Sequence, residues 1–272
     1  MLYFILFIIL VIGAYITRQT FEKRAHKKLL SAPLWDTEWE TILKNVPLCK
    51  RLPVELRPKL EGKINLFLDQ VEFQGCNGLD VTPEMELSIA AQACVLVVNN
   101  DAWYQTLQTI LIYPNAFKSR QASHDGYVVT QREVVRTGES WARGPVILSW
   151  AHAAQDAFID DDGHNVVLHE FAHQLDALSG YTDGAPILSD AHSNDDWDRI
   201  LNKSFNRLVS DVEKGHETTL DPYGATAPAE FFAVAVEMFF ERPTELKHEE
   251  PAVYAQLSKL FVLDPDGWTE PE

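Results

Sequence analysis

The segment formed by residues 166–176 places two histidines and a glutamate at the spacing of a metal site. His169 and His173 are four residues apart, so on a helix they share one face, with Cβ atoms about 5–6 Å apart. Two imidazoles at that separation can bind one tetrahedral ion such as Zn²⁺. Glu170 would lie beside the ion, where it could accept a proton from a water molecule. The pattern H-E-x-x-H therefore predicts one catalytic zinc per chain, with Glu170 as general base.

The residues around this motif are apolar, and this strengthens the metal interpretation. They are Val166, Val167, Leu168, Phe171, Ala172 and Leu175. A helix that is hydrophobic on nearly every side belongs in a protein core. Burial of two imidazoles and a carboxylate without partners is costly, so a bound ion would explain why they occur there. The alternative, a chance match on a solvated surface helix, fits this apolar setting poorly.

A third ligand must come from elsewhere, because a catalytic zinc usually takes three protein ligands and keeps one position open. Ser179 stands six residues after His173, which excludes the longer metzincin pattern. The candidates are three glutamates of one apolar helix, Glu230, Glu237 and Glu241. Glu230 is favoured because it lies in the first helical turn, next to a loop that could shape a cleft. Glu237, two turns later on the same face, could instead orient a histidine, and Glu241 is expected to be exposed.

Two residues near the motif have more than one interpretation. Tyr223 precedes Glu230 by seven residues, and its phenol could stabilise an oxyanion. The residues alone favour the other interpretation, an aromatic ring packed under the loop. Asp176 could accept a hydrogen bond from a histidine or cap the local backbone. His164 is not expected to be a ligand, because its spacing from His169 points it elsewhere.

The hydrophobic periodicity predicts an α+β fold that is mostly helical with a small sheet. Helical patterns cover residues 34–72, 82–98, 166–177, 195–213, 231–240 and 245–262. Runs of β-branched and aromatic residues predict strands at 107–113, 127–135 and 146–150. The last strand precedes the motif helix. It could be a sheet edge that pairs with an extended peptide, or a plain core strand.

The N-terminal segment predicts a membrane anchor. Residues 2–16 carry no charge, and a basic cluster (Arg18, Lys23, Arg24, Lys27, Lys28) follows them. By the positive-inside rule this arrangement places the rest of the chain in the cytoplasm. We therefore expect a single-pass inner-membrane protein, with a transmembrane helix at 1–17, a basic linker at 18–33 and a catalytic domain at 34–265. The alternative is a buried N-terminal helix.

The net charge and the cysteine content narrow the possible binding partners and the possible cellular compartment. The formal net charge of −17 argues against direct nucleic-acid binding, which requires basic patches. The 3 cysteines, Cys49, Cys76 and Cys94, form neither a disulfide framework nor a C-x-x-C pair. This cysteine usage suits a reducing compartment.

Several sequence blocks together resemble the Mlc titration factor A family of zinc metallopeptidases, over about residues 35–265. They are IAAQAC at 89–94, ILIYP at 110–114, GESW at 138–141, GPVILSW at 144–150, GHNVVLHEFAHQLD at 163–176 and PAEFFAV at 228–234. The resemblance implies a zincin-like domain similar to the gluzincin-type catalytic domain of anthrax lethal factor. It also implies a peptide or protein substrate and aminopeptidase-like activity.

The same resemblance implies roles for individual residues. His169, His173 and Glu230 match the metal ligands, Glu170 matches the general base, and Tyr223 matches a tyrosine that assists the transition state. It further implies a partner, because the family's namesake binds the glucose-responsive repressor Mlc. A second hypothesis is therefore a non-catalytic protein that sequesters such a transcriptional repressor. The chain departs from the family pattern at residues 2–16 and at Ala227, where an Asn is expected.

Overall fold

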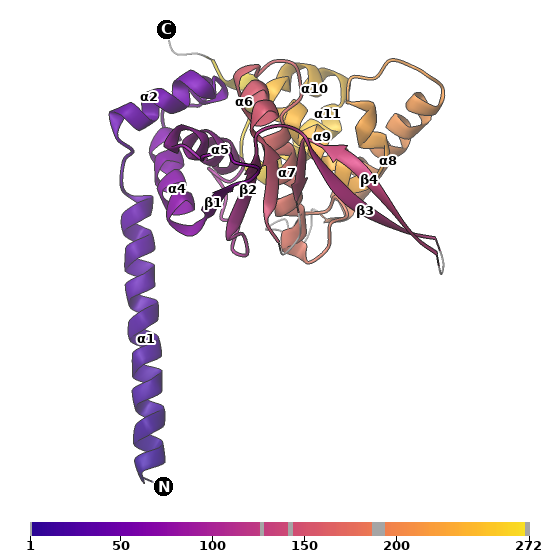
Figure 1. Ribbon diagram of the computed structural model, residues 1–272. Coiled ribbons are helices and arrows are strands. Elements are labelled where there is room, and N and C mark those ends of the chain that lie inside the picture. The colour runs from indigo at the N-terminus through magenta and orange to yellow at the C-terminus, as the bar shows by residue number, and fades with distance from the viewer. Residues whose placement is uncertain (1, 126–127, 141–143, 187–193, 270–272) are drawn as a thin grey trace.

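The computed structural model describes residues 2–125, 128–140, 144–186 and 194–269, and in it helices surround a small sheet (Figure 1). This four-stranded sheet has the order β1-β2-β6-β5. Strands β1 (Glu72–Gly75), β2 (Thr109–Tyr113) and β6 (Val146–Ser149) are parallel, with Phe73 opposite Ile110 and Ile110 opposite Val146. Strand β5 (Gly138–Ser140) pairs antiparallel with β6. The predicted α+β class, mostly helical with a small sheet, is confirmed.

The parallel pairing of β1 and β2 depends on helix α5 (Pro83–Val95), because parallel neighbours need a crossover connection. Thr82 caps this helix, since its hydroxyl accepts the backbone N–H of Met85 at 3.4 Å, and Pro83 fits the first turn. Strand β6 lies between β2 and β5, and both Val146 and Leu148 are fully buried. Of the two possibilities for 146–150, the structure thus supports a core strand, and the two edges of the sheet are β1 and β5.

The other helices largely follow the predicted pattern. They are α1 (Leu2–Leu30), α2 (Asp36–Asn45), α3 (Leu48–Arg51), α4 (Arg57–Gln70), α6 (Trp150–Phe158), α7 (Val166–Asp176), α8 (Asn194–Glu213), α9 (Pro228–Glu241), α10 (Pro243–Glu249) and α11 (Pro251–Phe261), with short 3₁₀ turns at η1 (Ala177–Ser179), η3 (Pro222–Ala225) and η4 (Pro265–Gly267). The single helix expected at 245–262 is instead α10 and α11, because Pro251 has no N–H to continue α10 and starts a new helix. Helix α6 was not expected.

A long hairpin projects from the body of the molecule (Figure 1). Strands β3 (Phe117–Asp125) and β4 (Val128–Arg136) pair antiparallel, from Phe117 opposite Arg136 to Asp125 opposite Val128. The strand predicted at 127–135 corresponds to β4, whereas β3 was not predicted.

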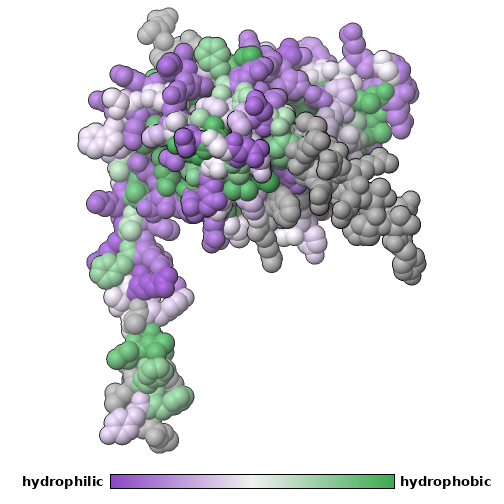
Figure 2. All heavy atoms as spheres, in the orientation of Figure 1, coloured by the Kyte–Doolittle hydropathy of each residue, from purple (hydrophilic) through white to green (hydrophobic). Residues whose placement is uncertain are grey.

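The predicted transmembrane helix is wrong, and with it the membrane as a partner and the single-pass inner-membrane localisation. Within the described ranges, no helix combines the length and apolarity needed to cross a membrane. Helix α1 has 29 residues, but its half nearer the body is a mixture of hydrophilic and hydrophobic residues (Figure 2). Arg18 already forms an ion pair with Glu22 at 2.8 Å. The apolar run 2–16 rises about 22 Å, less than the ~30 Å hydrocarbon core.

Candidate metal centre

Helix α7 carries the histidines, and its sequence explains why it forms at this place. Asn165 caps it, since its side-chain Oδ1 accepts the backbone N–H of Leu168 at 3.0 Å. Leu168 and Phe171 are fully buried and fix one face of the helix in the core. The other face carries His169 and His173, whose ring centroids lie 4.9 Å apart in an edge-to-face arrangement. The predicted i, i+4 geometry is therefore present.

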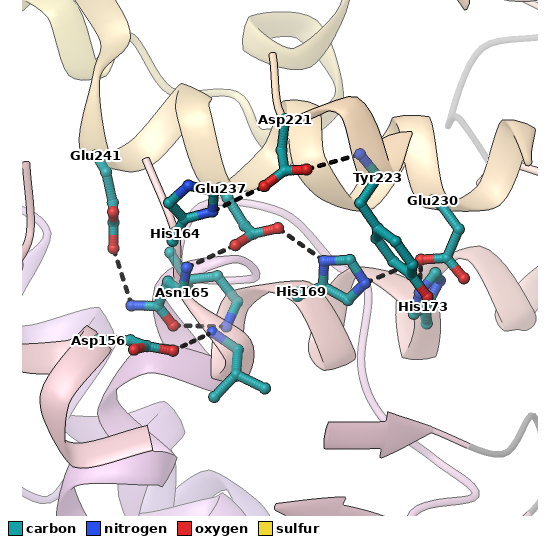
Figure 3. A network of polar contacts seen from close by, with 12 residues as sticks. Asp156, His164, Asn165, His169, His173, Asp221, Tyr223, Glu230, Glu237 and Glu241 are labelled. Atoms are coloured by element: carbon teal, nitrogen blue, oxygen red, sulfur yellow. Dashed lines mark hydrogen bonds and ion pairs between the residues drawn. The ribbon is translucent and has the colours of Figure 1, made fainter. Parts of the chain in front are cut away.

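Helix α9 packs against α7 and brings Glu230 to both imidazoles (Figure 3). Its Oε2 lies 3.0 Å from Nε2 of His169 and 3.3 Å from Nε2 of His173. One ligand atom from each of the three side chains lies within 4.8 Å of the others. The structure thus assembles the three residues that the sequence predicted as ligands. In the described part of the chain this is the cluster that could hold a metal ion.

The other two glutamates of α9 bind the start of α7 instead. Glu237 Oε1 lies 2.7 Å from Nδ1 of His169, on the ring edge that faces away from Glu230, and its Oε2 accepts the backbone N–H of Asn165 at 2.5 Å. Glu241 was expected to be exposed but is buried. Its oxygens accept the backbone N–H of Gly163 at 3.0 Å and the side-chain N–H of Asn165 at 3.1 Å.

The electrostatics of this cluster favour a bound cation. Burial by itself would lower the pKa of His169, but Glu237, Glu230 and Glu170 together raise it well above its ordinary value. Burial would raise the pKa of Glu230, yet the hydrogen bonds to His169 and His173 hold it well below its usual range. Negative charge thus exceeds positive charge at the imidazoles. A divalent ion supplies the missing positive charge, and two imidazole nitrogens with one carboxylate oxygen suit zinc. The residues present therefore fit a metal ion.

The cluster opens into a cleft of about 880 Å³, and both predicted catalytic side chains line it. Glu170 is nearly fully buried at its wall. Tyr223 is 49% exposed, and its ring centroid lies 6.1 Å from that of His169. The backbone N–H of Tyr223 donates to Asp221 at 2.6 Å, which fixes the turn that carries the phenol. A ring packed under the loop, the interpretation that the residues alone favoured, is not what the structure shows.

Two residues of the site escaped the sequence reasoning. Gly138 of β5 lies against the predicted base, because a Cβ built there would be 2.5 Å from Oε1 of Glu170. Asp156 of α6 accepts the backbone N–H of Val166 at 3.1 Å, and burial raises the pKa of its carboxyl to about 6. Neither contact has a local sequence signal, since each joins α7 to a different element, β5 for Gly138 and α6 for Asp156. His164, not expected as a ligand, lies 3.4 Å from Asp221 and is not part of the cluster.

A mostly helical α+β domain with two histidines of one helix and a glutamate of another at the floor of a cleft defines a metallopeptidase-like protein. Comparison with known proteins agrees with this class. Residues 20–262 match the glucose-regulated metallo-peptidase M90 family, and the chain belongs to that family.

Individual relatives cover most of the chain. An uncharacterised protein of Synechocystis, slr2042, is 45% identical over 243 residues, which is 88% of each chain. Mlc titration factor A of Klebsiella pneumoniae is 34% identical over 233 residues, which is 84% of this chain and 86% of that protein. Mlc titration factor A of Yersinia pestis is 32% identical over 84% of this chain and 85% of that protein. The resemblance stated from the sequence blocks is confirmed, and the family implies a bound metal ion.

Proposed function

We propose that this chain is a zinc-dependent peptidase of the gluzincin type, with aminopeptidase-like activity. His169, His173 and Glu230 hold one zinc ion. The single observation that carries the proposal is the approach of Glu230 Oε2 to the Nε2 atoms of both histidines, at 3.0 and 3.3 Å, on the floor of an open cleft. Membership of a metallo-peptidase family supports the same conclusion.

The chain's own residues divide the work of peptide hydrolysis among them. When bound, zinc lowers the pKa of a water molecule toward ~7 and polarises a substrate carbonyl. Glu170 accepts the proton of the attacking water and passes it to the leaving amine. Tyr223, on the exposed side of the cleft, donates a hydrogen bond to the oxyanion that develops on the carbonyl. Glu237 holds Nδ1 of His169, which leaves Nε2, the atom near Glu230, as the one that would bind an ion.

A second candidate function is the binding of a transcriptional repressor. It is favoured by one observation, the likeness over 84% of the chain to proteins named Mlc titration factor A. In this alternative the chain sequesters a repressor of the Mlc type, and the metal centre has only a structural role. The two functions differ in their need for Glu170, which a binding protein would not use.

The test is cleavage of a mixed peptide library by the zinc-loaded full chain, with fragments identified by mass spectrometry. We expect cleavage by the wild type and a loss on the order of 10²–10⁴-fold in Glu170→Gln, with zinc retained. Glu217→Gln, an exposed acid that does not line the cleft, is the matched control and should keep wild-type activity. Full activity in Glu170→Gln would refute the mechanism. No cleavage by the wild type, together with repressor binding that survives chelation, would favour the second function.

A further inference from the structure

The two histidines of the metal centre differ in what holds their Nδ1 atoms. Nδ1 of His169 is 2.7 Å from Glu237. Nδ1 of His173 is buried and has no hydrogen-bond partner among the residues that the structure describes. A neutral histidine that binds an ion through Nε2 carries its proton on Nδ1, and this buried N–H then needs an acceptor. When a metal ion is bound, a nearby group must therefore accept a hydrogen bond from Nδ1–H of His173.

Asp176 has an acceptor atom of the required kind. It is fully buried and lies three residues after His173, on the same face of α7. Its Oδ2 accepts the backbone N–H of Gly184 at 2.7 Å, while its Oδ1 is buried and has no hydrogen-bond partner in the described ranges. Burial raises the pKa of Asp176 to about 6, and His173 is among the groups that oppose this rise. A donor and an acceptor without partners thus lie one helical turn apart.

We propose that Asp176 is a positioning residue of the metal centre, whose Oδ1 accepts the Nδ1–H of His173 when the ion is bound. The contact is direct or passes through one water molecule. Each histidine ligand then has its own carboxylate, Glu237 from α9 for His169 and Asp176 from α7 itself for His173. This inference rests on the proposed zinc site, and it goes further by naming the residue that fixes the second ligand.

The same carboxylate links His173 to the helix that carries Glu230. Gly184, which donates to Asp176, has a φ of +80°, and a Cβ there would be 2.6 Å from the carbonyl oxygen of Pro228. Pro228 begins α9, two residues before Glu230. Trp197 holds the other side of Gly184, since its indole N–H donates to the carbonyl of Gly184 at 2.9 Å. Asp176 therefore connects His173 to the loop at Gly184. This loop packs on the first turn of α9, the helix that carries Glu230.

The competing explanation is that Asp176 only caps the loop. Asp176→Asn distinguishes a loop cap from a residue that positions His173. The amide oxygen of Asn can still accept a hydrogen bond from Gly184, but its amide nitrogen is a donor and replaces the acceptor that would face His173. Asp183→Asn is the matched control. It lies in the same loop, is exposed, and accepts the local N–H of Ala185 at 3.3 Å. Its charge also acts on Asp176, so it reports what loss of a nearby loop charge does by itself.

The experiment measures zinc affinity of the full chain by competition with a chromophoric chelator, and the thermal midpoint of the metal-free protein. We expect Asp176→Asn to lower zinc affinity about 10–100-fold, the range seen when such outer partners are removed, and Asp183→Asn to change it less than about twofold. A lower midpoint with unchanged zinc affinity in Asp176→Asn would mean that Asp176 only caps the loop, and would overturn the inference.

A second measurement needs no variant, in case Asp176→Asn does not fold. In the zinc-loaded wild type labelled with ¹⁵N-histidine, we expect the Nδ1–H protons of both His169 and His173 to be protected from exchange with solvent. Rapid exchange of the His173 proton beside a protected His169 proton would overturn the inference but leave the zinc site intact. A wild-type protein that binds no zinc would overturn the proposed function, and this inference with it.

Discussion

Oε1 of Glu237 lies 2.7 Å from Nδ1 of His169, while Oε2 of the same carboxylate accepts the backbone N–H of Asn165. Because Asn165 is the N-cap of α7, one side chain fixes both the start of the helix and the ring of His169, the first of the two proposed histidine ligands. Its place on the ring edge opposite Glu230 explains why two glutamates of one helix have different roles. Glu230 contacts the Nε2 atoms of both histidines, and Glu237 contacts the opposite edge of the His169 ring.

Replacement of Glu237 by Gln should weaken zinc binding without removing the site. The amide oxygen of Gln can still accept the backbone N–H of Asn165. Its NH₂ group then faces Nδ1 of His169, where a hydrogen-bond acceptor is needed. We expect zinc affinity to fall about 10–100-fold in chelator competition. Glu249→Gln, an exposed residue at the end of α10, is the control and should bind zinc like the wild type. Equal affinity in both variants would contradict the orienting role of Glu237.

A methyl group at position 138 should impair catalysis while zinc stays bound. The Cβ of Gly138→Ala would lie 2.5 Å from Oε1 and 2.7 Å from Cγ of Glu170, so the carboxylate must move. We expect kcat to fall at least about tenfold, because a displaced base loses its geometry for proton transfer. At Gly267, by contrast, an added Cβ meets nothing within 4 Å, and Gly267→Ala should keep full activity. Unchanged peptide hydrolysis by Gly138→Ala would argue against Glu170 as the base.

Removal of the Tyr223 hydroxyl should affect the chemical step. The phenol lines the cleft next to His169 and is accessible to substrate. If it donates to the oxyanion, Tyr223→Phe should lower kcat on the order of 10²-fold and change KM little. Tyr181→Phe, an exposed tyrosine of the loop after α7, is the control for loss of a phenol in general. A rise in KM at constant kcat would assign Tyr223 to substrate binding instead.

Glu241 should make the stability of the metal-free protein depend on pH. Burial raises its pKa to about 10, and the nearby Glu237 and Asp162 add to the rise. In the folded chain its carboxyl therefore keeps a proton that the unfolded chain releases near pH 4.3. The stabilisation is complete below that pH and is lost as the pH rises toward 10, so the free energy of unfolding should fall over this range.

Urea unfolding at pH 6 and pH 9, with chelator present, measures this effect. Glu241→Gln cannot ionise, so its free energy of unfolding should fall less between the two pH values than that of the wild type. Glu245→Gln, on the partly exposed first turn of α10, should behave like the wild type. The same decrease in wild type and Glu241→Gln would show that another group causes it.

The cluster of side chains that could hold a metal ion could be predicted because helical spacing converts directly into geometry. His169 and His173 share a face at i and i+4, and Glu230 was favoured by its place in the first turn of an apolar helix. The roles of Gly138 and Glu241 could not be predicted in this way. Gly138 matters only because β5 lies against α7, and Glu241 is buried only because the N–H groups of Gly163 and Asn165 meet it.

The order of the strands was also beyond the sequence pattern. Apolar runs indicated β2 and β6, but not that β5 would take the outer position beside β6. At the N-terminus, the apolar run 2–16 suggested a span, whereas the structure has one helix, α1, that continues through Arg18 and the charges after it. The local patterns thus located β2, β6 and the N-terminal helix. The order of the strands depends on contacts between strands, and whether α1 can span a membrane depends on the length of its apolar run.

The most direct test of the metal centre is the zinc content of the purified full chain after dialysis and reconstitution. We predict one zinc per chain in the wild type and in Glu170→Gln. We predict less than about a tenth of that in His169→Ala, His173→Ala and Glu230→Ala, because each removes one of three ligands. No zinc in the wild type after reconstitution, or full zinc in Glu230→Ala, would contradict the site described for His169, His173 and Glu230.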